Sequence, residues 1–141
     1  ESTNPCGEIP LCPYDSCRLL AINLFSYVDQ PFTKQAKFNW DLFKQHIHAA
    51  QRIMDDIIDL ELEKIDAILK KIADDPEDEE LKRTGKNLWL NIQTKANEGR
   101  RTGIGITAEG DMLAAMGLRY GSDEGSDFAI EIHKFIAIEA Y

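Results

Sequence analysis

The 141-residue chain has few cysteines, fewer positive than negative charges and no long apolar run. Its three cysteines are an odd number, which forms no closed disulfide framework and suits a reducing compartment such as the cytoplasm. Its net charge of −9 argues against binding to a nucleic-acid backbone, which needs clustered Lys and Arg. No apolar stretch approaches the roughly 20 residues of a membrane span, and no secretory signal opens the sequence. These absences predict a cytoplasmic protein that binds neither nucleic acid nor a membrane.

What is present is enough for one folded domain. The apolar share of 43% and the charged share of 29% are ordinary for a globular protein. No internal repeat and no linker divides the chain. We therefore expect a single domain over residues 1–141, with a loop and a short strand in 1–24, a helical region in 39–98, and a glycine-rich turn followed by helices in 99–141.

The positions of capping and breaking residues predict a mainly helical structure. Asn39 is suited to cap a helix, Pro76 to interrupt the helical region, and Ser122 or Asp123 to cap the last helix. Gly117 is suited to end a short helix. The pattern as a whole predicts about five helices and at most two short strands.

The two short strands are expected where the helical pattern fails. Residues 19–24 form a short apolar run typical of a buried strand, and residues 104–107 are expected to be extended. Side chains at steps of three and four residues should form the buried helix faces. They are Leu42, Phe43, Ile47, Ala50, Ile53, Met54, Ile57, Ile58, Leu62, Ile65, Ile68, Leu69, Ile72, Leu81, Leu88, Trp89, Ile92, Ala96, Phe128, Ile132, Phe135 and Ile136.

Three side chains with useful chemistry alternate near the start of the chain. Asn4, Cys6 and Glu8 are an amide, a thiol and a carboxylate, and alternate residues of an extended segment point to the same side. A second thiol, Cys17, follows eleven residues after Cys6. This combination points to redox chemistry.

Two separated motifs resemble the large, catalytic subunit of ribonucleotide reductases. The first is NPCGEIPL, followed by Cys17 and AINL, and its NPCGE spelling is most similar to the adenosylcobalamin-dependent, class II type. The second is GRRTGIGITAEGDMLAAMGLRYGSDE at 99–124. The resemblance implies that the chain is a fragment of a ten-stranded α/β barrel that reduces ribonucleotides to 2′-deoxyribonucleotides. A start at Glu1 instead of Met agrees with that expectation.

The resemblance also implies roles for individual residues. Cys6 would become the thiyl radical, and Glu8 would be the general base for the ribose 3′-hydroxyl. Asn4 would hold the substrate hydroxyls, although an Asx turn before Pro5 explains it as well. Cys17 would belong to the reducing dithiol, whose other member lies upstream of this chain.

Cofactor and partners follow from the same resemblance. The expected cofactor is adenosylcobalamin, with most of its binding site outside this chain. The expected partners are the ribonucleotide substrate, the remainder of the reductase chain and a thiol reductant such as thioredoxin, and the protein is a possible homo-oligomer. On this interpretation the isolated chain turns over nothing.

Other side chains have simpler interpretations. Cys12 is interpreted as structural, and a zinc site of Cys6, Cys12 and Cys17 is disfavoured because the spacings lack the geometry of ordinary zinc sites. Leu20 stands where the family usually has glycine and is expected to crowd the backbone near Cys17. The glycines of GIGITAEG are expected to allow a close approach of strand and helix. The remaining candidates are interpreted as surface, core-edge or core residues: His46, His48, His133, Asp55, Asp56, Asp59, Trp40 and Trp89.

Three functions of other kinds remain open. The chain is alternatively a split-gene polypeptide that works only with partner chains. It is alternatively a helical interaction module that retains an inactive motif. The third alternative is a thiol redox protein that uses Cys6 and Cys17 directly.

Overall fold

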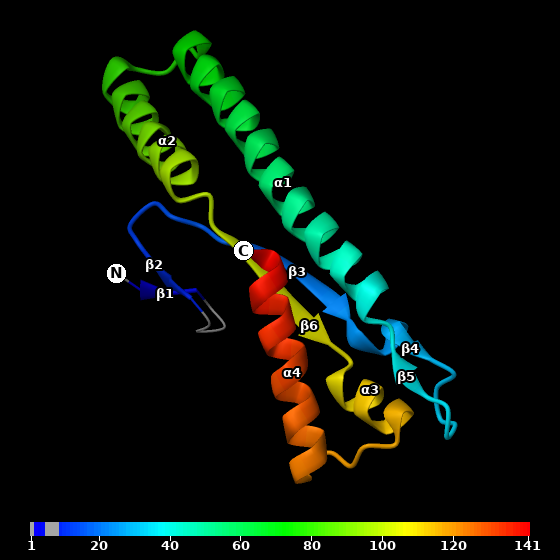
Figure 1. The fold of residues 1–141 in the computed structure, drawn as a ribbon. Coiled ribbons are helices and arrows are strands. Elements are labelled where there is room, and N and C mark those ends of the chain that lie inside the picture. The colour runs from blue at the N-terminus through cyan, green and yellow to red at the C-terminus, as the bar shows by residue number, and fades with distance from the viewer. Residues whose placement is uncertain (1, 5–8) are drawn as a thin grey trace. The chain divides into compact units, whose positions relative to one another are not determined.

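The computed structural model describes residues 2–4 and 9–141, and helices dominate it (Figure 1). The elements follow in the order β1 (Ser2–Thr3), β2 (Pro10–Leu11), β3 (Arg18–Asn23), the 3-10 helix η1 (Leu24–Tyr27), β4 (Val28–Asp29), β5 (Lys37–Phe38), α1 (Trp40–Asp74), α2 (Glu79–Gly99), β6 (Thr102–Thr107), α3 (Glu109–Met116) and α4 (Asp123–Ala140). The predicted mainly helical class is confirmed. No helix in these ranges is long and apolar enough to cross a membrane.

The predicted numbers of elements were wrong in both directions. The described residues hold four α-helices in place of about five, because the 35-residue helix α1 continues through two apolar patterns that had suggested separate helices. Neither Gly nor Pro interrupts it. The same residues hold six strands in three two-stranded ladders, and four of these strands are only two residues long, too short to give a period-two pattern. The described ladders close no barrel.

The chain divides into two compact units. The first, here called the hairpin unit, comprises the described residues up to Arg18 together with Ile53–Gly103. The second, here called the core unit, comprises Leu19–Arg52 and Ile104–Tyr141.

In the hairpin unit, the second half of α1 and the whole of α2 form an antiparallel helix pair (Figure 1). The two helices are joined by a short turn that contains Pro76, as predicted. Asp78 begins α2 by accepting hydrogen bonds from the backbone N–H groups of Glu80 and Leu81, at 2.9 and 3.0 Å. Met54, Ile58, Ile65 and Ala96 are the buried apolar side chains of this unit.

Several side chains expected to face inward on the helices are exposed. Leu81 is 57% exposed, and Leu42, Ile53, Ile57 and Leu88 are exposed as well. The apolar stripe of each helix is wider than the contact that one neighbouring helix can cover. The sequence pattern therefore overestimated burial in α1 and α2.

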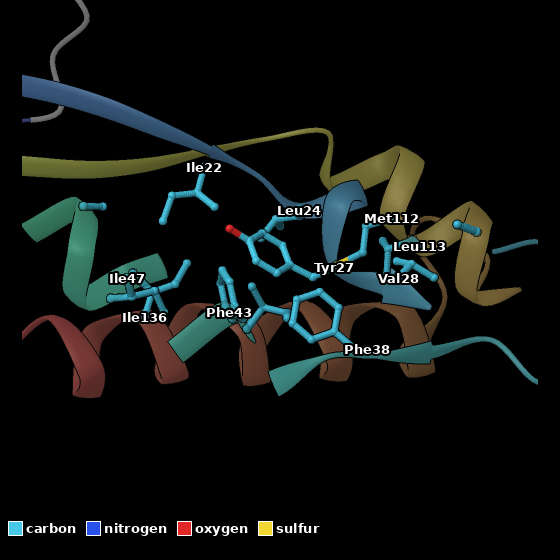
Figure 2. Packing of buried hydrophobic residues seen from close by; sticks show 13 residues of the cluster. Ile22, Leu24, Tyr27, Val28, Phe38, Phe43, Ile47, Met112, Leu113 and Ile136 are labelled. Atoms are coloured by element: carbon cyan, nitrogen blue, oxygen red, sulfur yellow. The ribbon is translucent and has the colours of Figure 1, made fainter. Parts of the chain in front are cut away.

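The core unit is built around a cluster of buried apolar side chains (Figure 2). Phe43 is central, with its ring centroid 4.8 Å from that of Tyr27, 5.2 Å from Phe38 and 5.8 Å from Phe135. Such aromatic separations are favourable. Helix α3 adds Met112 and Leu113, and α4 adds Ile132 and Ile136.

The predicted helix ends of this unit are confirmed. Asn39 accepts a hydrogen bond from the N–H of Leu42 at 3.1 Å, and Ser122 accepts one from Gly125 at 3.2 Å. Gly117 ends α3 in the left-handed conformation with φ of 75°. The predicted buried faces of α4 and of the start of α1, apart from Leu42, also agree with the structure.

Strands β3 and β6 lie side by side and run in the same direction (Figure 1). Both occupy segments that had been predicted to be extended. Leu20 packs against the apolar cluster, and its expected crowding of the backbone near Cys17 stays a prediction. A methyl group on Gly105 would meet the Leu20 carbonyl oxygen at an ordinary 3.7 Å, and one on Gly110 would meet nothing within 4 Å. Close approach therefore does not require glycine at these two positions.

Candidate functional site

The N-terminal ladder joins the two sides of the NPCGE motif. Strands β1 and β2 are antiparallel, with Thr3 opposite Pro10. Beyond them, the Asn4 backbone N–H donates to the Ile9 carbonyl, and the Ile9 N–H donates to Asn4 Oδ1, each at 3.1 Å. Asn4 is buried. The two residues that flank the segment 5–8 are thus bonded to each other.

The predicted site residues are only partly described. Cys6 and Glu8 lie outside the described residues, so their predicted roles stay predictions. Asn4 lies in the hairpin unit together with Cys17. The side chain of Asn4 accepts from Ile9, five residues away, which is a longer span than the Asx turn considered from the sequence.

A tight turn follows β2 and is held by a buried carboxylate. The Asp15 N–H donates to the Cys12 carbonyl at 3.1 Å. The side chain of Asp15 is only 3% exposed. Its Oδ1 accepts from the Ser16 N–H at 2.9 Å, and its Oδ2 accepts from Arg101 Nε at 2.5 Å. The turn is therefore anchored to the residues that lead from α2 into β6.

Cys17 lies directly after this turn and is half-buried. Its thiol lies 3.6 Å from the Arg18 carbonyl oxygen and donates to it. The Arg18 guanidinium donates to the Ser16 carbonyl at 3.3 Å and forms an ion pair with Glu61 of α1. The Arg18 N–H donates to the Arg101 carbonyl at 3.4 Å. Both neighbours of Cys17 are thereby fixed.

The electrostatics of this region reflect close packing of opposite charges. Burial lowers the pKa of Arg18, and the charges of Cys17 and Asp15 oppose that effect. The hydrogen bond that Arg101 donates to Asp15 raises the pKa of Arg101, and Cys12 acts on this pKa in the same direction. The interpretation of Cys12 as structural stays a prediction.

Arg100 explains much of the acidic face on α1. Its Nε donates to Asp55 Oδ1 at 2.8 Å, and its guanidinium pairs with Asp59 at 2.9 Å. The hydrogen bonds that Arg100 donates to Asp55 and Asp59 raise the pKa of Arg100. Arg100 also ends α2 with φ of 39°, in the left-handed region that non-glycine residues rarely adopt.

Asp15, Arg18, Arg100 and Arg101 were assigned no role from the sequence. Two adjacent arginines at the start of the second motif, in a chain of net charge −9, were the available signal. Their partners lie far away in the sequence: 86 residues separate Asp15 from Arg101, and 45 separate Asp55 from Arg100. No spacing rule identifies such pairs.

The three histidines have protein partners in the core unit. His46 Nδ1 lies 2.9 Å from the Tyr27 hydroxyl, His48 Nε2 lies 2.9 Å from Glu139, and His133 lies 3.6 Å from Glu109. These contacts agree with surface and core-edge roles. In the described parts of the chain, no three His, Cys, Asp or Glu side chains gather to hold a metal. A zinc site that included Cys6 falls outside those parts.

The described residues show no site for a corrin cofactor. An open hollow lies near the turn between α1 and α2, and its lining includes Glu79, Lys82, Arg83 and Lys86. A charged, open lining of this kind does not suit a large macrocycle, because binding sites for such ligands are mostly apolar and enclosed. The residues present therefore do not fit cobalamin by themselves.

Comparisons with known proteins cover the whole chain. The family model described as "Ribonucleotide reductase, barrel domain" matches residues 1–141. The chain is 30% identical over 141 residues to each of two vitamin B12-dependent ribonucleoside-diphosphate reductases, one from Mycobacterium tuberculosis and one from Thermoplasma acidophilum. The chain spans 16% and 15% of the length of these two relatives. No solved structure gives a significant match. The chain therefore belongs to the ribonucleotide reductase barrel-domain family, and the relatives it matches are oxidoreductases of the vitamin B12-dependent type.

Proposed function

We propose that this chain supplies the radical-bearing segment of a ribonucleotide reductase that converts ribonucleotides to 2′-deoxyribonucleotides. The observation that carries the proposal is the pair of hydrogen bonds between Asn4 and Ile9, which joins the two sides of the segment that contains Cys6 and Glu8. The family match over residues 1–141 supports it.

The proposed chemistry begins with a hydrogen-atom transfer to sulfur. A Cys6 thiyl radical takes the hydrogen atom from the ribose 3′ carbon, so that an S–H bond forms and a C–H bond breaks. Glu8 accepts the proton of the 3′-hydroxyl, which helps water to leave from the 2′ carbon. Asn4 uses its Nδ2 amide to hold a ribose hydroxyl, while its Oδ1 accepts from Ile9.

Cys17 is proposed to supply reducing equivalents. Together with a second thiol outside this chain, it gives two electrons and two protons to the substrate and closes to a disulfide. The first hydrogen atom then returns from Cys6 to the 3′ carbon, which regenerates the thiyl radical. A thiol reductant such as thioredoxin reduces the disulfide for the next turnover.

The proposed cofactor is adenosylcobalamin, in keeping with the names of the relatives. When bound, such a cofactor supplies the one-electron oxidation of sulfur that a side chain cannot perform alone. None of the residues described in this chain is assigned to hold it.

The exposed apolar side chains favour assembly with further protein. Leu60 of α1 and Leu81 and Leu90 of α2 are exposed by 60%, 57% and 38%, and contact with another structure would bury these apolar side chains. We propose that the remainder of the reductase chain covers them and that β3 and β6 become two strands of the ten-stranded barrel. On this proposal the isolated chain is inactive.

The test uses the complete reductase polypeptide that contains this segment. Cys6→Ser and Glu8→Gln are compared with Cys12→Ser, a thiol with no proposed catalytic role. With cobalamin, a dithiol and a ribonucleotide, Cys6→Ser should form no deoxynucleotide, and Glu8→Gln should lose roughly 100- to 10,000-fold in rate, the usual range for general acid–base catalysis. Undiminished deoxynucleotide formation by Cys6→Ser would refute the proposal.

A different outcome would favour one of the alternatives. If the complete polypeptide binds no ribonucleotide and forms no deoxynucleotide, the chain is a helical interaction module. If the 141-residue chain alone shows a reversible Cys6–Cys17 disulfide and exchanges it with thioredoxin, it is a thiol redox protein.

A further inference from the structure

Cys17 lies between two ion pairs that connect its neighbours to distant parts of the hairpin unit. Two residues before it, Asp15 bonds to Arg101 at 2.5 Å. One residue after it, Arg18 pairs with Glu61 of α1. Cys17 itself takes part in neither pair, but the backbone on both sides of it is held.

The Asp15–Arg101 pair is more buried than an ordinary surface ion pair. The side chain of Asp15 is 3% exposed and that of Arg101 34% exposed. Loss of Arg101 would leave the buried Asp15 carboxylate without a compensating charge, which is strongly destabilising. The folded protein is therefore expected to keep this pair together. The same carboxylate accepts a hydrogen bond from the backbone N–H of Ser16, the residue directly before Cys17.

Arg18 holds the other side through three separate contacts. Its side chain, 9% exposed, reaches Glu61 and the Ser16 carbonyl, and its backbone N–H reaches the Arg101 carbonyl. The Arg101 carbonyl thus contacts the residue directly after Cys17, and the Arg101 guanidinium contacts Asp15, two residues before Cys17. The carbonyl of Arg18 accepts from the Cys17 thiol.

We propose that Arg101, with Asp15, and Arg18, with Glu61, are positioning residues that hold the Cys17 sulfur in the geometry required for disulfide formation during ribonucleotide reduction. The inference rests on the proposed function, because it assigns Cys17 to the reducing dithiol. Neither arginine is proposed to touch the substrate.

The chemistry of a dithiol explains why the backbone must be held. The two thiols lose two electrons and two protons to the substrate, and one S–S bond forms, which requires sulfur atoms to approach within narrow limits of distance and dihedral angle. A dithiol reductant must then break this bond. Its first thiolate attacks one sulfur, which forms a mixed disulfide and releases the other cysteine, and its second thiol displaces the remaining cysteine and closes the reductant's own disulfide. A segment free to move would reach this geometry only part of the time.

The test measures turnover and Cys17 chemistry in the complete reductase polypeptide. Arg101→Gln and Asp15→Asn remove one partner of the first pair, and Arg101→Lys keeps the charge. Arg18→Gln removes one partner of the second pair. Lys71→Gln is the matched control, because Lys71 forms an ion pair with Asp75 at 2.8 Å on the surface of α1 in the same unit. Readouts are kcat and KM for a ribonucleotide, and the yield of deoxynucleotide from prereduced enzyme in a single turnover.

Arg101→Gln and Asp15→Asn should lower kcat and the single-turnover yield with KM nearly unchanged. The expected loss is roughly ten- to a hundredfold, the scale seen when a reacting group is misplaced by about 1 Å. Arg101→Lys should recover part of this loss, and Lys71→Gln should match the parent enzyme. If Arg101→Gln lowers Tm but leaves kcat and single-turnover yield equal to those of Lys71→Gln, the pair is merely structural and the inference is overturned.

Cys17→Ser, measured alongside, separates this inference from the proposed function. Full turnover by Cys17→Ser would remove Cys17 from the dithiol and overturn the positioning role, while ribonucleotide reduction by the Cys6 segment would still stand. Loss of turnover in Cys17→Ser with normal turnover in Arg101→Gln, Asp15→Asn and Arg18→Gln would overturn only the positioning role.

Discussion

Asn4 and Ile9 are connected twice, once through their backbones and once through the Asn4 side chain, with both hydrogen bonds at 3.1 Å. The first bond survives any substitution of Asn4 other than proline, whereas the second depends on a side-chain acceptor. This difference allows the contribution of the side chain to be measured alone.

Asn4→Ala should loosen the connection between the two sides of the NPCGE segment. Loss of one hydrogen bond to a partly buried N–H costs about 1 kcal/mol, so amide hydrogen exchange at Ile9 should accelerate roughly fivefold. Asn4→Asp keeps an acceptor and should preserve more of the protection. The matched control is Asn23→Ala, which removes a 3.1 Å bond to the Phe25 N–H in the core unit and should leave Ile9 unaffected. Equal exchange at Ile9 in the parent and in Asn4→Ala would contradict the prediction.

Two adjacent residues of α1 should differ sharply in their contribution to stability. Phe43 is fully buried among aromatic rings, whereas Leu42 is 37% exposed. Phe43→Ala should lower the free energy of unfolding by about 3–5 kcal/mol, because it removes a large buried ring and leaves a cavity. Leu42→Ala should cost about 1 kcal/mol or less, because little apolar area is lost. Chemical denaturation of both variants measures the difference. Equal losses in the free energy of unfolding would show that Phe43 is not buried as described.

Two glycines in helices should respond in opposite ways to alanine. A methyl group on Gly125 would lie 2.5 Å from the Arg119 carbonyl oxygen, a backbone atom, so Gly125→Ala forces the chain before α4 to move. We expect a destabilisation of about 1–3 kcal/mol, as for other overpacked sites. Gly110→Ala meets nothing within 4 Å in α3 and should stabilise the protein by about 0.5–1 kcal/mol. Thermal unfolding of the two variants should therefore move Tm in opposite directions.

The Glu139 carboxylate should make stability depend on acidic pH. Its hydrogen bonds with Lys44 and His48 lower its pKa in the folded protein from the ordinary value of 4.5. Because the folded pKa is depressed, the stabilisation is present above the unfolded pKa and is lost as pH falls through the folded pKa. The parent protein should lose Tm below about pH 4.5 more steeply than Glu139→Gln does. Glu131→Gln, at an exposed position of the same helix, is the control and should retain the parental slope.

From local signals in the sequence, the positions of the helices and strands were predicted more accurately than the way in which they pack. Asn39, Pro76, Gly117 and Ser122 act through bonds and conformations within a few residues, and each lies at the predicted element boundary. The two-residue strands had no such signal. Leu81 was predicted to be buried and is exposed. The burial of a side chain depends on what packs opposite it in space, and the periodicity of the sequence does not carry that information.

The candidate site divides in the same way. The motif around Asn4 and Cys6 pointed to the family, and the comparisons confirm the family over the whole chain. The roles of Asn4, Cys6, Glu8 and Cys17 stay predictions until the variants above are measured. Asp15 and Arg101 were overlooked, although both lie close in sequence to residues that had been singled out.

The amino-acid sequence alone was sufficient for the helical class, for the helix ends marked by capping or breaking residues, and for the family. These depend on neighbours within a few residues or on matching strings of residues. Only the tertiary structure shows which charged side chains pair. The pairs are Asp15 with Arg101, Arg18 with Glu61 and Arg100 with Asp55. Opposite charges on one chain have many possible partners, and burial together with geometry selects among them. The thiol chemistry of Cys17 is therefore given by its residue type. Its surroundings are given by Glu61 and Arg101, which lie far from it in the sequence and are brought close by folding.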